Sequence, residues 1–268
     1  MKFDTLEDRM NYYRSMTDYK LIPGSYVLVM LDGRGFSKKI KKQFNRPFDE
    51  DFIEIMNQTA QYLCKNIEGC KIAYVQSDEI SLIITDFDTP TTDAWFGYRL
   101  SKILSIAASI ATSKFNQLMI SRELRLGDYI TDSPEDAVIN MKLYEFDCKA
   151  WNVPTENDVF AWFLHRQLDC IRNSKQQAAQ TYLPKKSLLN LTTDQQCDLL
   201  KDTHGISWSE YKEGEKYGRF IWKTQEKRIH PDTGEEYYRS TWQVNNAWPL
   251  YEESGQAKWR NLNLLPKL

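Results

Sequence analysis

The sequence predicts an α+β fold, and three features of residues 25–85 support this prediction. Residues 25–31 form a nearly continuous apolar run rich in β-forming residues, which is typical of a strand buried on both faces. Residues 52–67 then follow a helical period, and residues 72–85 contain two β-type runs around a short polar group. With a further helix and strand downstream, the order becomes β-α-β-β-α-β. This is the ferredoxin-like arrangement, a four-stranded antiparallel sheet with two helices on one face.

An apolar stripe defines the first predicted helix. Its members recur at helical spacing, and they are Phe52, Met56, Ala60, Leu63 and Ile67. Three acidic residues, 49–51, stand in the first turn, where the helix dipole favours negative charge. Gly69 follows the expected end of the helix.

The next segments complete the predicted sheet. The runs 72–76 and 80–85 flank the residues Ser77–Glu79, so we expect a hairpin with its acids at or near the turn. A second helix is expected from about Asp93, on a stripe made of Phe96, Leu100, Ile103, Ala107, Ile110 and Ala111.

Two further segments follow this helix. Residues 124–137 contain Gly, Asp, Ser and Pro and are expected to form a loop. Residues 142–153 are then expected to supply the last strand of the sheet.

The composition becomes helical beyond residue 154. Thr155 is a candidate N-cap for a long helix, and its apolar set is Val159, Phe160, Phe163, Leu164, Leu168 and Ile171. A shorter helix is expected over residues 193–201 with Thr192 as its cap. Residues 230–236 are expected to form a turn between two polar strands.

These elements suggest two parts that act as one catalytic unit. Residues 1–153 would form the sheet-containing catalytic domain. Residues 154–268 would form a helical, fingers-like extension with short strands, packed on that domain.

The composition limits the function classes. The net charge is only −2, so any binding of RNA must come from a local basic surface. The five cysteines form no CxxC pair and no zinc spacing with the three histidines, which favours a reduced, cytoplasmic setting. No uninterrupted apolar run approaches the length of a membrane span, so no membrane association is expected.

Two acidic positions stand out at the strand ends. In the predicted topology the first strand and the hairpin are neighbours, so Asp32 and Asp78 can lie close together. Two close carboxylates repel, and a hard divalent cation with oxygen ligands relieves that repulsion. Two Mg²⁺ ions about 3.5–4 Å apart are the usual apparatus for nucleotidyl transfer. Gly33 and Gly35 would let the backbone approach metal and phosphate, which completes the outline of a palm-type nucleotidyltransferase site.

Each motif alone also has a simpler interpretation. An Asp-Gly pair after a strand is most often a turn, and Ser77–Glu79 could be a solvated hairpin tip. A basic run either faces solvent or contacts phosphate, and it comprises Lys38, Lys39, Lys41 and Lys42. The same two options hold for a polar helix face comprising Arg166, Asp169, Asn173 and Gln180, with Arg172 beside it. Cys170 is interpreted as a packed core residue.

Five segments in order carry a family resemblance. They are "LDGRGF" (31–36), "RPFDE" (46–50), "AYVQSDEIS" (73–81), "FDCKAWNVP" (146–154) and "HRQLDCIRNS" (165–174). Together they resemble the tRNA-histidine guanylyltransferase superfamily, over roughly residues 5–225. Members of that superfamily have a polymerase-like palm and extend RNA 5′ ends in the 3′-to-5′ direction. The resemblance implies two Mg²⁺ ions, activation of a 5′-monophosphate by ATP or GTP, and attack by the 3′-hydroxyl of an incoming nucleoside triphosphate.

The resemblance also implies roles for individual residues. Asp32, Asp78 and Glu79 would be catalytic, and the metals would be held by Asp32, the Gly33 carbonyl and Asp78. Nucleotide would be bound by Asp32, Gly33, Arg34, Gly35, Phe36, Ser37, Arg46, Ser77, Asp78 and Lys102. RNA would be contacted by Lys38, Lys39, Arg99, Arg166, Arg172 and Asn173. The partners implied are tRNA, nucleoside triphosphates and further copies of the chain, such as in a tetramer.

Departures from the family pattern narrow the expected activity. Enzymes that add one guanylate to histidine tRNA carry "HINN" after the Asp-Cys pair, whereas this chain carries "IRNS", residues 171–174. Phe48 replaces a usual Asn, and Lys149 replaces a usual Arg. This pattern is similar to the guanylyltransferase-like branch, which repairs 5′-truncated tRNAs by template-directed addition. The alternatives are addition of a single guanylate to tRNA(His) and, in another class, a non-catalytic tRNA-binding protein.

Overall fold

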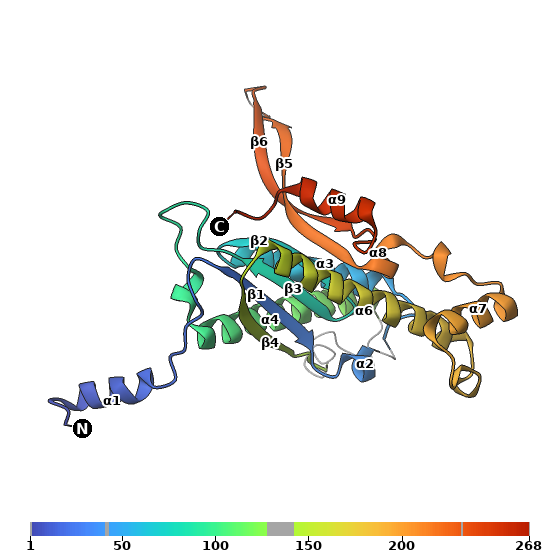
Figure 1. Cartoon of the computed structure of the whole chain (residues 1–268), viewed down its shortest axis with the longest axis horizontal. Helices are drawn as coiled ribbons and strands as arrows, with labels where there is room; N and C mark the ends of the chain where they lie inside the picture. The colour runs from blue at the N-terminus through green and yellow to red at the C-terminus, as the bar shows by residue number, and fades with distance from the viewer. Residues whose placement is uncertain (1, 41–42, 128–141, 232, 268) are drawn as a thin grey trace.

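The fold is an α+β arrangement built on one antiparallel sheet, seen in a computed structural model that describes residues 2–40, 43–127, 142–231 and 233–267. Within these residues the sheet has six strands in the order β4-β1-β3-β2-β5-β6 (Figure 1). The strands are β1 (Tyr26–Gly33), β2 (Cys70–Gln76), β3 (Glu79–Ile84), β4 (Phe146–Val153), β5 (Arg219–Ile229) and β6 (Glu236–Asn246). Strands β1 to β4 confirm the expected β-α-β-β-α-β order.

The sheet contains the four expected strands and two more, so it is wider than the four-stranded sheet that was predicted. In such a sheet β2 would be an edge strand with unpaired backbone groups, and β5 covers that edge by pairing Ile72–Val75 with Arg219–Trp222. Strand β6 pairs with β5 along its whole length. The hairpin that β5 and β6 form extends beyond the body of the molecule (Figure 1). The expected turn at residues 230–236 lies between them, although residue 232 is outside the described residues.

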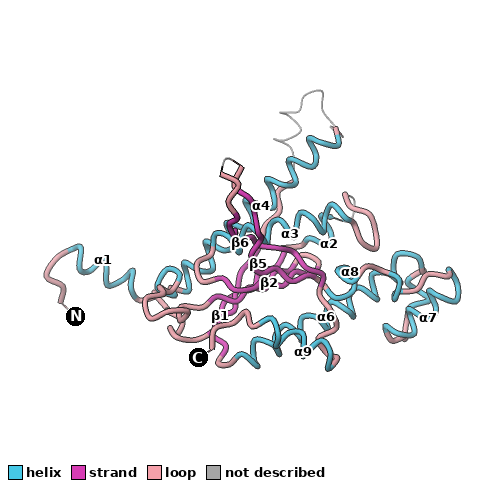
Figure 2. Tube along the Cα trace, turned by 90° about the horizontal axis from the view of Figure 1, so that it is seen from above, coloured by secondary structure: helices cyan, strands magenta, loops and turns pink. Residues whose placement is uncertain are grey.

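Helices cover both faces of the sheet. Helices α3 (Glu50–Asn66) and α4 (Leu100–Leu126) pack on one face, against alternate residues such as Val27, Val29 and Leu31 of β1. Helices α6 (Glu156–Tyr182) and α9 (Glu253–Leu262) cover the other face, where Tyr26 and Leu28 point (Figure 1, Figure 2). The alternation of strand side chains therefore creates two cores on opposite sides of one sheet.

Shorter elements complete the chain. They are α1 (Leu6–Ser15), α2 (Phe36–Lys39), the 3₁₀ turns η2 (Trp95–Tyr98), η3 (Lys185–Leu188) and η4 (Trp208–Glu210), α7 (Thr193–His204) and α8 (Glu213–Tyr217). Helix α1 buries none of its residues and stands apart from the sheet (Figure 1).

Side-chain caps begin three helices: Thr155 and Thr192 are the predicted caps, and Asp49, predicted in the first turn, is the cap of α3. The side chain of Asp49 accepts a hydrogen bond from the Phe52 amide at the start of α3. Thr155 caps α6 in the same way, and Thr192 forms a reciprocal capping box at α7. These caps confirm the first turns of all three helices, because each satisfies backbone amides that have no partner within the helix.

The second predicted helix begins later and ends later than expected. Phe96 and Tyr98 have positive φ angles of 53° and 54°, so the chain turns there and α4 begins at Leu100. Phe96 is exposed, whereas Ile103, Ala107 and Ala111 are buried as predicted. Helix α4 continues through Leu126, so the start of the expected loop is helical. Residues 128–137 of that loop, like Lys41 and Lys42, lie outside the described residues.

Two smaller predictions are also corrected. The last strand of the core begins at Phe146 rather than residue 142, because the Tyr144 backbone is hydrogen-bonded to the Asn116 side chain instead of a strand. Leu168, expected on the apolar face of α6, is half exposed. Cys170 is buried, as expected.

Helix α4 is the one helix of the described residues that is long and apolar enough to span a membrane by length and composition. The sequence shows no uninterrupted apolar run of that length here, because charged and polar residues lie between the apolar residues of α4. Its buried residues, including Ile103 and Phe115, belong to the core between α3, α4 and the sheet. This packing is that of a core helix.

Candidate functional site

Acidic side chains form a row across three neighbouring strands. In the strand register Asp32 of β1 lies opposite Glu79 of β3 on one side and Asp147 of β4 on the other. Residues directly opposite each other share a face of the sheet, and this is the face covered by α6. Asp32 and Gly33 are paired within β1, so the simpler interpretation of this Asp-Gly pair as a turn does not apply.

The β2–β3 turn brings a further carboxylate to this row. Ser77 has a positive φ of 45°, and its hydroxyl donates a hydrogen bond to Asp78 Oδ1 at 3.0 Å. The Gly33 amide donates to the Asp78 carbonyl at 3.1 Å, which fixes the turn against β1. A Cβ atom on Gly33 would lie 2.6 Å from the ring of Phe36 and 2.9 Å from the Asp78 Cβ. Glycine is therefore required for this close approach.

The two predicted metal ligands have raised pKa values. Burial, followed by the charge of Asp32, raises the pKa of Asp78 to about 6. Burial and the neighbouring Asp147 also raise the pKa of Asp32. No ion-pair partner for either carboxylate occurs among the described side chains. The pair therefore has an excess of negative charge that a cation would relieve.

The carboxylates of Asp32 and Asp78 fit a Mg²⁺ ion that takes its remaining ligands from a nucleotide and from water. Over the described residues, no group of three or more His, Cys, Asp or Glu side chains is placed to hold a metal ion. Mg²⁺ is commonly bound by one or two carboxylates, with substrate phosphates and waters as its other ligands. Asp32, Asp78 and the Gly33 carbonyl match that donor set when a nucleotide supplies the rest.

Glu79 has a different environment from its neighbours. Its two carboxylate oxygens accept hydrogen bonds from Nε and Nη2 of Arg166, at 2.7 and 2.6 Å. Arg166 also donates from Nη1 to Asp169 Oδ2 at 2.6 Å, and Asp169 in turn pairs with Arg172. The predicted contact of Arg166 with RNA has no support, because carboxylates occupy its guanidinium. Glu79 is therefore a member of the acidic row whose charge is already paired, with Arg166.

A cavity of about 530 Å³ opens beside the acidic row. Asp32, Ser77 and Asp78 line it together with Arg46 from the segment between α2 and α3. Aromatic rings form part of another wall, among them Phe44 and Phe48, and residues of α6 face them from across the cavity. The cavity thus combines carboxylates, a cation and apolar surface, as sites for phosphorylated aromatic ligands do.

A buried arginine also lines this cavity. Arg219 of β5 is only 4% exposed, and it donates to Asn57 Oδ1 and to the Gly214 carbonyl, each at 3.0 Å. Burial lowers the pKa of its guanidinium. Within the described part of the chain no carboxylate is close enough to form an ion pair with it. A ligand with acceptor atoms would therefore stabilise this charge.

The structure brings together only some of the predicted nucleotide residues. Asp32, Arg46, Ser77 and Asp78 line the cavity, and Ser37 lines an adjoining hollow with Asn173. Gly33 lies beneath the Asp78 turn. Three others are placed elsewhere: Phe36 is buried in the core, and Arg34 and Gly35 are exposed in the connection to α2.

Apart from Arg46 and Arg166, the described basic residues predicted to contact nucleotide or RNA do not line the cavity. Lys39 pairs with Glu145, Arg172 with Asp169, and Lys38 is exposed. Arg99 pairs with Asp18, and the Leu100 amide is bonded to the Tyr19 carbonyl, close to where β1 begins. Lys102 is one turn further along α4, so it lies at the opposite end of β1 from Asp32. Lys102 therefore does not line the cavity, and its predicted contact with nucleotide stays a prediction.

Sequence reasoning missed several residues of the cavity. Arg219 was not singled out, although an arginine at the start of the apolar run "FIW" was a signal that could have found it. Phe44 and Gln177 gave no signal, because their contact with the cavity depends on how α6 crosses the segment before α3. Glu215 lines the cavity from α8, a helix that was not predicted.

Comparisons with known proteins add to this geometry. A family model described as tRNA(His) guanylyltransferase matches residues 7–154, more than half of the chain. The fold is similar to that of a bacterial tRNA(His) guanylyltransferase-like protein in complex with ATP, with a TM-score of 0.79 and 32% identity over 95% of this chain and 98% of that one. A complex of such a bacterial protein with GTP gives a TM-score of 0.74 and 32% identity over 98% of this chain and 100% of that one.

A curated relative is the probable tRNA(His) guanylyltransferase of Homo sapiens. It is 30% identical over 172 residues, which cover 63% of this chain and 51% of the human protein. The chain spans about half the length of the curated guanylyltransferases it matches.

Proposed function

This chain belongs to the tRNA(His) guanylyltransferase family, and from that premise we propose that it is a Mg²⁺-dependent nucleotidyltransferase that adds nucleotides to the 5′ end of truncated tRNA. The addition would be template-directed and would proceed in the 3′-to-5′ direction. The 5′-monophosphate of the RNA would first be activated by ATP or GTP with loss of pyrophosphate. The 3′-hydroxyl of an incoming nucleoside triphosphate would then form the new bond and displace the activating nucleotide.

The observation that carries this proposal is the pair Asp32 and Asp78 in the lining of one nucleotide-sized cavity. Both have raised pKa values, and the described residues offer neither of them an ion-pair partner. Mg²⁺ held there with the Gly33 carbonyl would neutralise phosphate charge and make the attacking hydroxyl more acidic.

Other residues of the cavity would bind and orient the nucleotide. Arg46 and the Ser77 hydroxyl lie at the carboxylate end and would bind phosphate oxygens. Phe44 and Phe48 would pack against the base and exclude water from it. Arg219 would donate hydrogen bonds to acceptor atoms of the ligand.

Two sequence features support the repair activity over addition of one guanylate. The segment "IRNS" replaces the "HINN" of enzymes specific for histidine tRNA, and its Asn173 lines the cavity. Phe48 replaces the usual Asn in the cavity wall and can pack against any base. The Phe48 replacement exchanges a polar amide for an apolar ring, and the other exchanges a His and an Asn for Ile171 and Ser174 while it introduces Arg172.

The decisive experiment is an extension assay. Purified protein would be incubated with a 5′-monophosphorylated tRNA that lacks its first nucleotide, together with ATP, each nucleoside triphosphate in turn, and Mg²⁺. Each of the four bases would be placed opposite the addition site. We expect the added nucleotide to follow the template base, and we expect Asp32→Ala and Asp78→Ala to abolish extension. Absence of any longer product at high enzyme concentration would overturn the proposal.

The same assay tests a second candidate that the family description favours. A guanylyltransferase specific for tRNA(His) would add one guanylate to that tRNA whatever base lies opposite. Addition confined to GTP and to tRNA(His) would replace template-directed repair with this activity.

A further inference from the structure

One segment supplies much of the cavity wall without regular secondary structure. Residues 43–49, which we call the pocket loop, connect α2 to α3 and include Phe44, Arg46 and Phe48. Under the proposed function, this loop presents Arg46 to the phosphates and two rings to the base. Its position therefore determines whether the cavity can accept a nucleotide.

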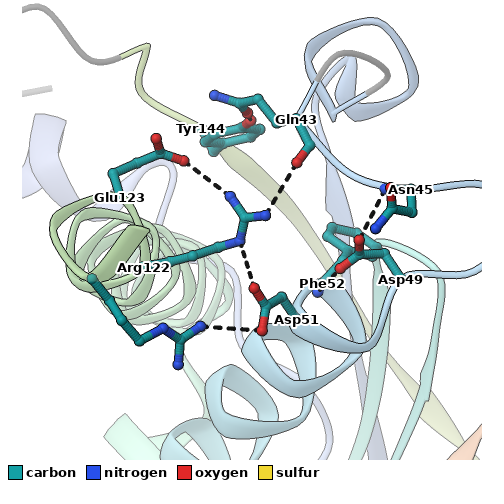
Figure 3. Close-up of polar contacts among 9 residues, drawn as sticks. Gln43, Asn45, Asp49, Asp51, Phe52, Arg122, Glu123 and Tyr144 are labelled. Carbon is teal, nitrogen blue, oxygen red and sulfur yellow. Dashed lines mark hydrogen bonds and ion pairs between the residues drawn. The ribbon is translucent and has the colours of Figure 1, made fainter. Parts of the chain in front are cut away.

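The α3 end of the pocket loop is held by a cap. One oxygen of Asp49 accepts from the Phe52 amide at 3.0 Å, and the other accepts from the Asn45 amide at 2.9 Å (Figure 3). This arrangement joins the loop to the first turn of α3. The beginning of the loop has other contacts: the Gln43 and Phe44 amides donate to the Ile40 carbonyl, the Tyr144 hydroxyl donates to the Gln43 side chain, and the Phe44 ring packs on Phe52.

Arg122 of α4 holds that beginning from behind the cavity. Its Nη2 donates to the Gln43 carbonyl at 3.2 Å, and its Nε donates to Asp51 Oδ2 at 2.9 Å (Figure 3). The guanidinium also lies over the ring of Phe44, with 4.5 Å between its central carbon and the ring centroid. One guanidinium thus contacts the loop backbone, a ring of the cavity wall and the start of α3. Its side chain is only 12% exposed, so water competes weakly for these contacts.

A second arginine offers a natural comparison. Arg125, one turn further along α4, donates to the other oxygen of Asp51 at 3.1 Å. It is 66% exposed, and no contact with Gln43 or Phe44 is found for it in the described structure. The two arginines share a carboxylate partner, but only Arg122 reaches the pocket loop.

We propose that Arg122 is a positioning residue that holds the pocket loop in its nucleotide-accepting conformation. Arg122 does not line the cavity itself, so it would act through Gln43 and Phe44 rather than by touching the nucleotide. The inference rests on the proposed function, because it assumes that the cavity binds a nucleoside triphosphate. Its specific consequence is that loss of Arg122 weakens nucleotide binding while leaving the rest of the fold in place.

The test compares Arg122→Met with Arg125→Met. Methionine keeps much of the length of each side chain and removes the guanidinium. Hydrogen exchange would be followed at the amides of Phe44 and Asn45, which donate to the Ile40 carbonyl and to Asp49. Affinities for ATP and GTP would be measured by calorimetry in the presence of Mg²⁺. Steady-state extension assays would separate KM for nucleotide from kcat.

We expect Arg122→Met to speed exchange at these two amides about tenfold or more, and to raise Kd and KM for nucleotide by a similar factor. Exchange in β1 to β3 and kcat at saturating nucleotide should stay near wild type. Arg125→Met should match wild type in every measurement. Arg122→Lys keeps a charge beside Asp51 but lacks the fork that also reaches Gln43, so it should rescue little of the affinity.

Other outcomes would distinguish failure of the proposed role of Arg122 from failure of the proposed function. Equal loop exchange and equal affinity in the two methionine variants would overturn the role of Arg122. Faster exchange throughout the chain in Arg122→Met would also overturn it, because the residue would then be a general stabiliser. If the wild-type protein binds neither ATP nor GTP, the proposed function itself fails, and the nucleotide-positioning role fails with it.

Discussion

Arg166 on α6 binds both carboxylate oxygens of Glu79 on β3, through hydrogen bonds of 2.7 and 2.6 Å. The two side chains are 14% and 9% exposed, so this forked ion pair is largely shielded from water. Glu79 directly follows Asp78, so the pair ties the helical extension to the turn that carries a proposed metal ligand. This ion pair therefore joins the acidic row directly to α6 in the C-terminal half of the chain.

We expect Arg166→Met to destabilise the protein by about 3–5 kcal/mol, because it leaves the buried Glu79 carboxylate without its partner. Combining it with Glu79→Gln should recover much of that loss, since the second change removes the unpaired charge. The measurement is urea unfolding of the two single variants and the double variant. Arg172→Met is the matched control: Arg172 is more than half exposed and, among the described residues, forms an ion pair with Asp169 alone, so its loss should cost less than about 1 kcal/mol. Additive effects of the two changes would contradict a direct interaction.

The raised pKa of Asp78 predicts a specific pH dependence. Burial raises this pKa to about 6, from an ordinary value of 3.8. Between these pH values the folded chain binds more protons than the unfolded chain, so the free energy of unfolding should fall as pH rises through this window. Asp78→Asn should flatten the fall and leave the metal-free protein more stable than wild type at neutral pH.

Unfolding in EDTA at a series of pH values between about 4 and 7 measures this effect. The raised pKa of Asp32 acts in the same direction, so Asp78→Asn should reduce the slope without removing it. Mg²⁺ with nucleotide should stabilise wild type more than the variant, because only wild type keeps both carboxylates. A slope unchanged by the substitution would contradict the assignment to Asp78.

Substitution of Arg219 is expected to lower the affinity for nucleotide. Charged hydrogen bonds contribute about 1.5–3 kcal/mol, so Arg219→Met should raise the Kd for ATP or GTP by about tenfold or more. The thermal midpoint should change little, because the substitution removes a buried charge that lacks a carboxylate partner. Calorimetry and thermal unfolding check the two expectations separately. Unchanged affinity would mean that the ligand does not reach this end of the cavity.

The central strands, their helices and the closeness of Asp32 to Asp78 could be predicted from local patterns in the sequence. Their apolar periods are long and regular, and acids at the ends of buried strands are conspicuous. Asp32 was expected at the end of the first strand, and pairing with β4 extends β1 one residue further, through Gly33.

The parts that escaped prediction depend on distant contacts. The Arg166–Glu79 pair joins residues 87 positions apart, and nothing local in α6 shows that it lies against the hairpin. Strands β5 and β6 are too polar to be recognised as extensions of a core sheet, yet β5 closes the edge of β2. Lys102 was assigned from family resemblance, and only the direction of α4 places it at the far end of β1.

Gly33 gives the most direct test of how the two carboxylates are held together. A Cβ atom there would lie 2.6 Å from the Phe36 ring and 2.9 Å from the Asp78 Cβ, both well inside contact distance. Phe36 is buried and packs on Phe115, Tyr144 and Phe146, so it has little room to move. The Asp78 turn must then shift away from β1, which would lengthen the hydrogen bond from the Gly33 amide to the Asp78 carbonyl. We expect Gly33→Ala to lower stability by about 1–3 kcal/mol, as overpacking does, and to abolish extension activity.

Gly35→Ala is the matched comparison for that variant. Gly35 has a positive φ of 66°, so alanine is strained there, but nothing lies within 4 Å of its added Cβ atom. The two variants should therefore lose similar stability while only Gly33→Ala loses Mg²⁺-dependent nucleotide binding, measured by calorimetry at a temperature where both remain folded. Equal nucleotide affinity in the two variants would show that the Asp78 turn tolerates displacement, and the spacing of Asp32 and Asp78 would then not depend on Gly33.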